Sequence, residues 1–304
     1  MNFLAEILAL TVGLIWAVSG LISVNPVRAF GGLAFARVRQ NVVALVLLAA
    51  IPVFGAFEVL TWPQVGLLCA SGFVGIFLGD TFLFAALGRL GPRRNAMIFA
   101  TNAPMTALLA VAVGKDQIAP GEWLGIFLVL AGVMIAIVYG KRRDQLHKWE
   151  QVQGPMWIGV GFAILAAMGQ AAGLVISDFV IDVADSEKPP VVLVAFIRAG
   201  IAAVALNAIA LTGFRAARAP AGVSQQNWGL AVLSGIWGMG LGMTLLVWAQ
   251  SIGSEVGLIS ALSQTTPVWI LPLLWIWTRQ RPAGLAFVGA GIAVIGVFLI
   301  QLGG

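Results

Sequence analysis

Apolar residues in this chain form ten long blocks that contain few charges, instead of alternating regularly with polar residues. A helix needs about 20 mostly apolar residues to cross roughly 30 Å of hydrocarbon, and each block is about this long. Turn-forming pairs such as Asn25-Pro26, Gly31-Gly32 and Gly91-Pro92 separate the blocks. We therefore predict ten membrane-spanning helices, near residues 3–22, 33–56, 64–88, 95–113, 121–139, 156–177, 190–213, 227–251, 257–277 and 283–301.

Composition supports an all-α polytopic membrane protein. Of the 304 residues, 60% are hydrophobic and 10% are charged, whereas a soluble domain is about 25% charged. The loops between the blocks are too short for a soluble catalytic domain. The single cysteine, Cys69, and the single histidine, His147, exclude disulfide frameworks and His/Cys zinc sites. We therefore expect no cofactor, no metal site and no enzymatic activity.

The positive charges are distributed unevenly over the loops. Twelve of the seventeen lysines and arginines fall in odd-numbered loops, whereas the even-numbered loops hold only Lys115 and Lys188. Short cytoplasmic loops are enriched in basic residues, so we predict that the odd loops face the cytoplasm and that both termini lie outside. The net charge of +5 thus reflects orientation in a bacterial inner membrane and not nucleic-acid binding.

The chain contains an internal repeat. Shifting it by 163 residues aligns GFVGIFLGDTFLFAA, from Gly72, with GIWGMGLGMTLLVWA, from Gly235, with seven of fifteen positions identical. The same shift aligns Pro104 with Pro267. We divide the chain into a first five-helix repeat (1–140), a basic linker (141–155) and a second five-helix repeat (156–304). Because five is odd, the second copy must enter the membrane from the opposite side, and such inverted repeats are typical of transporters.

With these features the chain resembles the drug/metabolite transporter superfamily, in its ten-helix EamA-type branch, and within it the YddG-type amino-acid exporters. The resemblance rests on the two five-helix copies, the Pro104 and Pro267 pair, and a few single residues and glycine-rich ends. These are Trp16, Arg39, Arg198, GEWLGIFLVLAGV from Gly121 and GLAFVGAGIAVIGV from Gly284. The resemblance implies export of amino acids, other small metabolites or drugs.

The chain also departs from this family. Many relatives carry a glutamate after the fourth and ninth helices, where this chain has Lys115 and Arg279. Small four-helix relatives couple transport to protons through a glutamate in the first helix, but Glu6 lies near a helix end here. Proton coupling therefore does not carry over. Relatives of this length usually place both termini in the cytoplasm, contrary to the charge distribution.

Three charged residues within the spans are candidates for function, because a charge inside hydrocarbon is costly without a partner or a polar cavity. Asp80 could attract an ammonium group or carry a proton, or it could simply hydrogen-bond to Thr81 or to a neighbouring helix. Arg39 and Arg198 align at a shift of 159 residues. They could extend to the lipid headgroups, or they could guard opposite mouths of a cavity.

The fourth and ninth helices each carry a polar cluster before a proline. Such a proline frees a backbone carbonyl and kinks the helix, so the cluster can face a polar cavity or satisfy the freed carbonyls itself. The expected kinks are at Pro104 and Pro267, and the cluster residues are Thr101, Asn102, Ser263, Gln264, Thr265 and Thr266.

Further candidates for the same cavity are polar or aromatic residues deep in the other spans. Gln170 and Ser19 add polar groups, and the deep tryptophans Trp16, Trp237 and Trp269 could line a cavity or serve only as packing. Seven other tryptophans fall near span ends and suit the membrane interface: Trp62, Trp123, Trp149, Trp157, Trp228, Trp275 and Trp277. The segment KRRDQLHKWEQ (141–151) is expected to be a solvated linker without a chemical role.

The sequence therefore predicts a secondary transporter that exports small metabolites, in particular amino acids with broad selectivity, by alternating access through a central cavity at the membrane midplane. A multidrug or other metabolite exporter of the same fold is an alternative, and so is a channel or scramblase. The expected partners are a small-molecule substrate and the lipid bilayer. A monomer is sufficient, because one chain already supplies both five-helix units.

Overall fold

The computed structural model describes residues 3–53, 60–114, 120–139, 147–182, 189–252, 262–263 and 265–302. Within these ranges the chain is helical and contains no strand, and each of the ten expected spans holds a helix. Six spans are long and apolar enough to cross a membrane, and three shorter apolar helices accompany them. The helices are α1 (Phe3–Phe30), α2 (Gly32–Val53), α3 (Trp62–Ser71), η1 (Gly72–Leu78), α4 (Gly79–Leu90), α5 (Pro92–Phe99), α6 (Asn102–Ala112), α7 (Pro120–Val138), α8 (Met156–Asp182), α9 (Val191–Leu211), α10 (Gln225–Gly235), η4 (Ile236–Leu241), α11 (Gly242–Ile252), α13 (Thr266–Thr278) and α14 (Gly284–Leu302).

One local prediction was wrong, and it concerns the end of the first span. Helix α1 continues through Asn25 and Pro26 and ends only before Gly31, whose φ of 81° reverses the chain. A proline near the end of a helix removes one backbone hydrogen bond, and Pro26 is buried there. Pro104 and Pro267, where kinks were expected, lie in the first turns of α6 and α13, directly after a break in each span. A proline lacks the N–H that would continue the helical hydrogen bonds across such a break.

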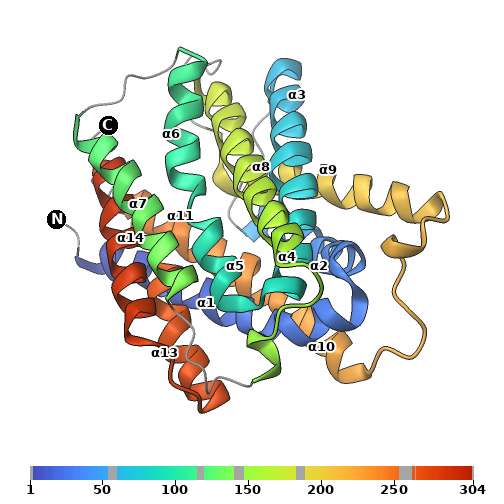
Figure 1. Cartoon of the computed structure of the whole chain (residues 1–304). Coiled ribbons are helices and arrows are strands. Elements are labelled where there is room, and N and C mark those ends of the chain that lie inside the picture. The colour runs from blue at the N-terminus through green and yellow to red at the C-terminus, as the bar shows by residue number, and fades with distance from the viewer. Residues whose placement is uncertain are drawn as a thin grey trace.

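The last helices of the two repeats pack against each other in opposite directions. A Cβ at Gly125 would lie 2.7 Å from the carbonyl oxygen of Gly296, and one at Gly132 would lie 2.5 Å from that of Gly289. Contacts therefore move backwards along α14 as they move forwards along α7, and Figure 1 shows the two helices side by side. Equivalent helices that pack antiparallel are what inverted repeats require.

Substitutions at this seam test the packing. Gly132→Ala is expected to lower stability by about 2 kcal/mol, because the new methyl group would meet backbone atoms of α14 that cannot rotate away. Gly291 aligns with Gly132 at a shift of 159 residues and is taken as its repeat mate, but nothing lies within 4 Å of a Cβ there. Gly291→Ala should be neutral or slightly stabilising, since alanine favours helix. Thermal unfolding in detergent measures both variants, and equal losses would contradict this account.

The packing unit is not the sequence repeat. Helix α8 of the second repeat packs on α3, η1, α4, α5 and α6 of the first, and α9 joins them. We name this group bundle A. Helix α1 of the first repeat packs on α10, η4, α11 and α13 of the second, with α2 beside it, and we name this group bundle B. Contacts between α2 and α9, and between α1 or α2 and α4, connect the bundles.

The predicted linker segment is solvated only in part: Lys148 and Gln151 are exposed, but two residues between them are buried, and residues 141–146 lie outside the described residues. Trp149 and Glu150, in the short turn η2 (Lys148–Glu150), are only 4% and 2% exposed. Trp149 is therefore not an interfacial residue, whereas the six other tryptophans assigned to the interface are exposed: Trp62, Trp123, Trp157, Trp228, Trp275 and Trp277. This turn therefore packs against the rest of the protein through Trp149 and Glu150.

Candidate functional site

The third and eighth spans both change from α-helix to π-helix at the same point of the repeat. Segment η1 starts at Gly72 and η4 starts one residue after its mate, Gly235. Both end at aligned leucines, Leu78 and Leu241. A π-helical turn is rare and often marks a functional site. Its recurrence in both copies indicates a feature of the repeat and not a local irregularity.

Each π segment lies against an arginine from the other sequence repeat. A Cβ at Gly238 in η4 would lie 3.3 Å from Nη2 of Arg39, which comes from α2. A Cβ at Gly75 in η1 would lie 3.5 Å from Nη2 of Arg198, which comes from α9. The glycines therefore leave the space that the two guanidinium groups occupy. Arg39 is only 8% exposed, which argues against the alternative in which it extends to the headgroups; its role at a cavity mouth stays a prediction.

Asp80 forms an ion pair with Arg39. The distance between Nη1 of Arg39 and Oδ2 of Asp80 is 3.3 Å, and the two side chains are 10% and 20% exposed. The carboxylate therefore bonds to a neighbouring helix, as one of the two alternatives expected, while Thr81 donates to the carbonyl of Phe77. The guanidinium carbon of Arg39 also lies 5.1 Å from the centre of the Phe84 ring.

The group of Arg39, Asp80 and Arg198, here named the charge cluster, has two positive charges and one negative charge. Arg198 is near enough for its charge to act on the Asp80 carboxylate. The buried Nε atoms of Arg39 and Arg198 have no hydrogen-bond partner among the described residues. An excess positive charge and unused donors make this cluster suited to an anionic group.

Matching contacts from the two copies surround the charge cluster. Trp16 donates from Nε1 to the carbonyl of Gly238 over 3.0 Å, and Ser19 donates to the carbonyl of Ser234 over 3.2 Å. On the other side, Ser71 donates to the carbonyl of Gly173 over 2.6 Å.

The Gln170 backbone also lies against Gly79, beside Asp80. The structure thus brings together six residues that the sequence singled out: Trp16, Ser19, Arg39, Asp80, Gln170 and Arg198.

The polar clusters of the fourth and ninth spans lie at the helix breaks. Thr101 and Thr265 are buried, and their hydroxyls donate over 2.7 Å to the carbonyls of Ile98 and Leu262. These bonds favour the alternative in which such hydroxyls satisfy the backbone. Thr266 donates to the carbonyl of Gly13 over 3.2 Å, so this break packs on α1.

The remaining members of these clusters, and Trp237 of the eighth span, stay predictions as substrate-binding residues. Asn102 and Ser263 are buried, Trp237 is 38% exposed, and Gln264 lies outside the described residues.

Sequence reasoning missed two features of the site, the π segments and the ion pair. The aligned glycines at 72 and 235 and the aligned arginines were visible signals, but nothing in the sequence placed Arg39 opposite Asp80. Over the described residues there is no group of three or more His, Cys, Asp or Glu side chains that could hold a metal ion. The charge cluster has the donors and the charges to bind a charged group of a ligand.

Comparison with known proteins points to one family. The family model described as the EamA-like transporter family matches twice, over residues 3–138 and 157–302. A solved crystal structure of a protein superposes with a TM-score of 0.66 at 21% identity, covering 98% of this chain and 96% of that one. This likeness supports the fold alone.

Curated relatives match over short segments. The uncharacterized transporter YyaM of Bacillus subtilis is 35% identical over 69 residues, 23% of each chain. The UDP-galactose transporter homolog 1 of Cryptococcus neoformans is 32% identical over 71 residues, 23% of this chain and 17% of that one. The solute carrier family 35 member B1 homolog of Drosophila melanogaster is 27% identical over 81 residues, 27% and 23% of the two chains. The chain thus matches less than a quarter of the length of these relatives, and the narrower likeness to YddG-type exporters stays a prediction.

Proposed function

The chain belongs to the EamA-like transporter family, and from this premise we propose that it exports small metabolites, amino acids in particular, by alternating access. The proposal places it in a bacterial inner membrane as a monomer, with the odd loops in the cytoplasm. The observation that carries it is the charge cluster, in which Arg39 pairs with Asp80 over 3.3 Å, while Arg198, the equivalent arginine of the second copy, lies against the matching π segment. The two arginines lie at π segments, where the helices depart from regular geometry.

An amino acid matches the charges of this cluster. Its carboxylate pairs with the unused donors of Arg198, and its ammonium group approaches Asp80. The cluster alone carries one excess positive charge, which is costly inside the membrane. A substrate with a net negative charge neutralises this excess, whereas a zwitterion leaves it. Acidic amino acids should therefore bind better than neutral ones, and basic ones should bind worst.

The inverted repeat supports alternating access through the same cluster. Arg39 and Arg198 are equivalent in the two copies, so exchanging the conformations of the copies also exchanges the environments of the two arginines. Asp80 has no equivalent acid, because its repeat mate is Met243. In this proposal the carboxylate pairs with Arg39 in one state and turns toward Arg198 in the other.

A nucleotide sugar is a second candidate substrate. The name of the Cryptococcus relative refers to UDP-galactose, and two guanidinium groups also suit a diphosphate. A diphosphate would bind both arginines, but Asp80 would then repel it. The charge cluster for this reason favours a substrate that also carries a positive group.

Counterflow in proteoliposomes tests the proposal. Purified protein is reconstituted, and uptake of labelled glutamate, leucine, lysine and UDP-galactose is measured with and without the same unlabelled compound inside. We expect saturable uptake of amino acids that internal substrate accelerates, with the order acidic, neutral, basic. Repeating the assay with a pH gradient reports proton coupling. If only UDP-galactose is taken up, the substrate is a nucleotide sugar and not an amino acid. If a compound crosses the membrane but unlabelled compound inside does not accelerate its uptake, the protein is a channel.

A further inference from the structure

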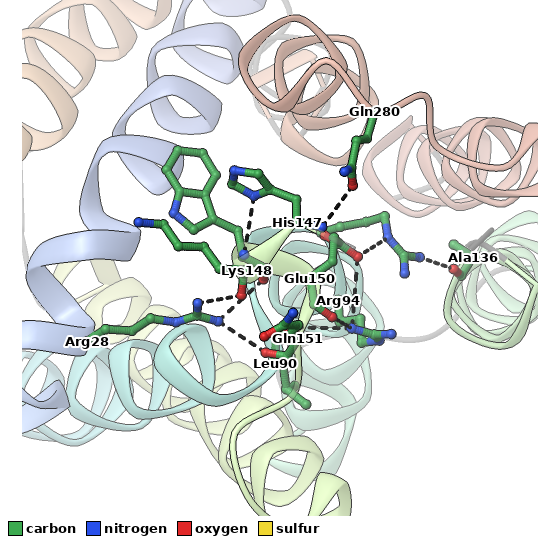
Figure 2. Close-up of polar contacts among 11 residues, drawn as sticks. Arg28, Leu90, Arg94, Ala136, His147, Lys148, Glu150, Gln151 and Gln280 are labelled. Atoms are coloured by element: carbon green, nitrogen blue, oxygen red, sulfur yellow. Dashed lines mark hydrogen bonds and ion pairs between the residues drawn. The ribbon is translucent and has the colours of Figure 1, made fainter. Parts of the chain in front are cut away.

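The linker turn at residues 147–153 sits where bundle A and bundle B meet, on the face formed by the odd loops. Figure 2 shows this turn between Arg28 of α1, Arg94 of α5 and Gln280, which follows α13. Gly91 allows the close approach, because a Cβ there would overlap the carbonyl oxygen of Trp149. The turn is therefore fitted into the protein and bridges both bundles.

Contacts of the turn with bundle A are ionic and buried. Nε of Arg93 lies 3.1 Å from Oε2 of Glu150, and these side chains are 0% and 2% exposed. Nη1 of Arg94 donates over 3.0 Å to the backbone carbonyl of Glu150. The amide of Gln153 donates over 2.8 Å to the carbonyl of Arg89. Separating a buried ion pair leaves two uncompensated charges, so this side of the turn is firmly held.

Contacts with bundle B contain no ion pair among the described residues. Arg28 donates to the backbone carbonyls of Lys148, over 2.6 Å, and of Gln151, over 3.2 Å. Nε1 of Trp149 donates over 2.9 Å to Oδ1 of Asn25 on α1.

Near the end of α13, the amide of His147 donates over 2.9 Å to Oε1 of Gln280, and the rings of Trp149 and Trp277 are centred 6.0 Å apart. Water can replace each of these partners when the two sides separate.

We propose that residues 147–153 form a latch that closes the odd-loop face, and that this face opens when bundle B leaves the latch. In this mechanism the latch stays bound to bundle A through Glu150, Arg93 and Arg94. The contacts of Asn25, Arg28 and Gln280 break and re-form in each cycle. The linker between the repeats lies on the odd-loop face, and the opposite face has no equivalent segment in the part of the chain that the structure describes. The two faces therefore open by breaking different contacts.

The local chemistry of the latch favours a neutral His147. Burial and the charge of Lys148 lower the pKa of His147, while Glu150 raises it and Arg28 lowers it further. In the neutral form its Nδ1 accepts the backbone N–H of Trp149 over 3.3 Å. This bond supports the turn that presents the His147 amide to Gln280.

Cysteine labelling tests the latch without any substrate, so its result does not depend on the proposed function. Val27 of α1 faces Gly88 of α4, one bundle against the other, and is 2% exposed. In a Cys69→Ser background, Val27→Cys is labelled with a membrane-impermeant maleimide applied to the odd-loop face. Gln280→Ala removes one hydrogen bond, so labelling should become about five-fold faster. Gln280→Glu keeps an acceptor oxygen and should label at the parent rate.

Thr212→Ala is the matched control, because Thr212 is exposed on a loop of the same face and bonds only its own helix, at Ile209. Its labelling rate should equal that of the parent. Hydrogen exchange provides a second measurement that needs no cysteine. In Gln280→Ala the amide of His147 should exchange faster, while that of Gln153 on the bundle A side stays protected. Equal labelling in Gln280→Ala and the parent, or equal loss of protection at both amides, would overturn the proposal.

Discussion

Transport by an Asp80→Asn variant is expected to fall roughly a hundred-fold or more. In the proposed site the Asp80 carboxylate binds the ammonium group of the substrate, and its removal also leaves Arg39 and Arg198 without a counterion. Losing one partner of a charge pair in a binding site costs about 2–5 kcal/mol of binding free energy. About 3 kcal/mol corresponds to roughly a hundred-fold in a binding equilibrium. The measurement is counterflow by purified variants, with protein amount and thermal stability determined in parallel.

Companion variants separate a transport role of Asp80 from a purely structural one. Arg39→Gln should destabilise less than Asp80→Asn, because the carboxylate keeps the charge of Arg198 nearby. The double variant Arg39→Gln with Asp80→Asn should regain part of the stability, since one uncompensated cation is gone. It should nevertheless remain inactive. If the double variant transports as well as the parent, the charge cluster is structural and the proposed site is wrong.

Gly91→Ala is expected to lower stability by on the order of 3–5 kcal/mol, the largest loss we expect from a glycine. The backbone at Gly91 has φ 81° and ψ 171°, a region that other residues almost never adopt. An alanine Cβ would also overlap the carbonyl oxygen of Trp149. The latch must then move away, which breaks the buried pair of Glu150 and Arg93. Thermal unfolding followed by tryptophan fluorescence measures the loss.

Gly114→Ala is the control for backbone strain alone. Gly114 also has a positive φ, of 74°, but nothing lies within 4 Å of a Cβ there. Its loss should be about 1–2 kcal/mol, the cost of a left-handed conformation for an ordinary residue. Similar losses in the two variants would show that docking of the latch adds nothing to stability. A further expectation is that Gly91→Ala exposes Trp149 to a soluble quencher, whereas Gly114→Ala does not.

The spans and the repeat were predictable because hydropathy and residue identity report them locally. Helix α14 begins at Gly284 and ends at Leu302, close to the predicted 283–301. The predicted end of the first span was wrong because tertiary contacts can outweigh the tendency of proline to end a helix. Pro26 is buried inside α1, and the helix continues past it. The membrane-interface position predicted for Trp149 failed for the same reason, since its indole finds a partner in Asn25.

The grouping of the helices into bundle A and bundle B was not predictable from the repeat. Sequence similarity groups residues 1–140 and 156–304, but α8 packs with the third and fourth spans and α1 packs with the eighth and ninth. The sequence pattern of glycines also does not show which glycines contact a neighbouring helix. Gly132 touches α14, while its repeat mate Gly291 faces open space.

The sequence by itself indicated that the chain has ten apolar spans, that it is duplicated with five spans in each copy, and that Asp80 is the one acid deep within a span. Each of these follows from the preference of single residues for lipid or water and from counting along the chain. The tertiary structure alone decided that Arg39 pairs with Asp80, that Arg39 and Arg198 lie against the π segments, and that Glu150 forms a buried ion pair with Arg93. These contacts join helices far apart in the sequence, and their energy depends on distance and burial, which hydropathy does not encode.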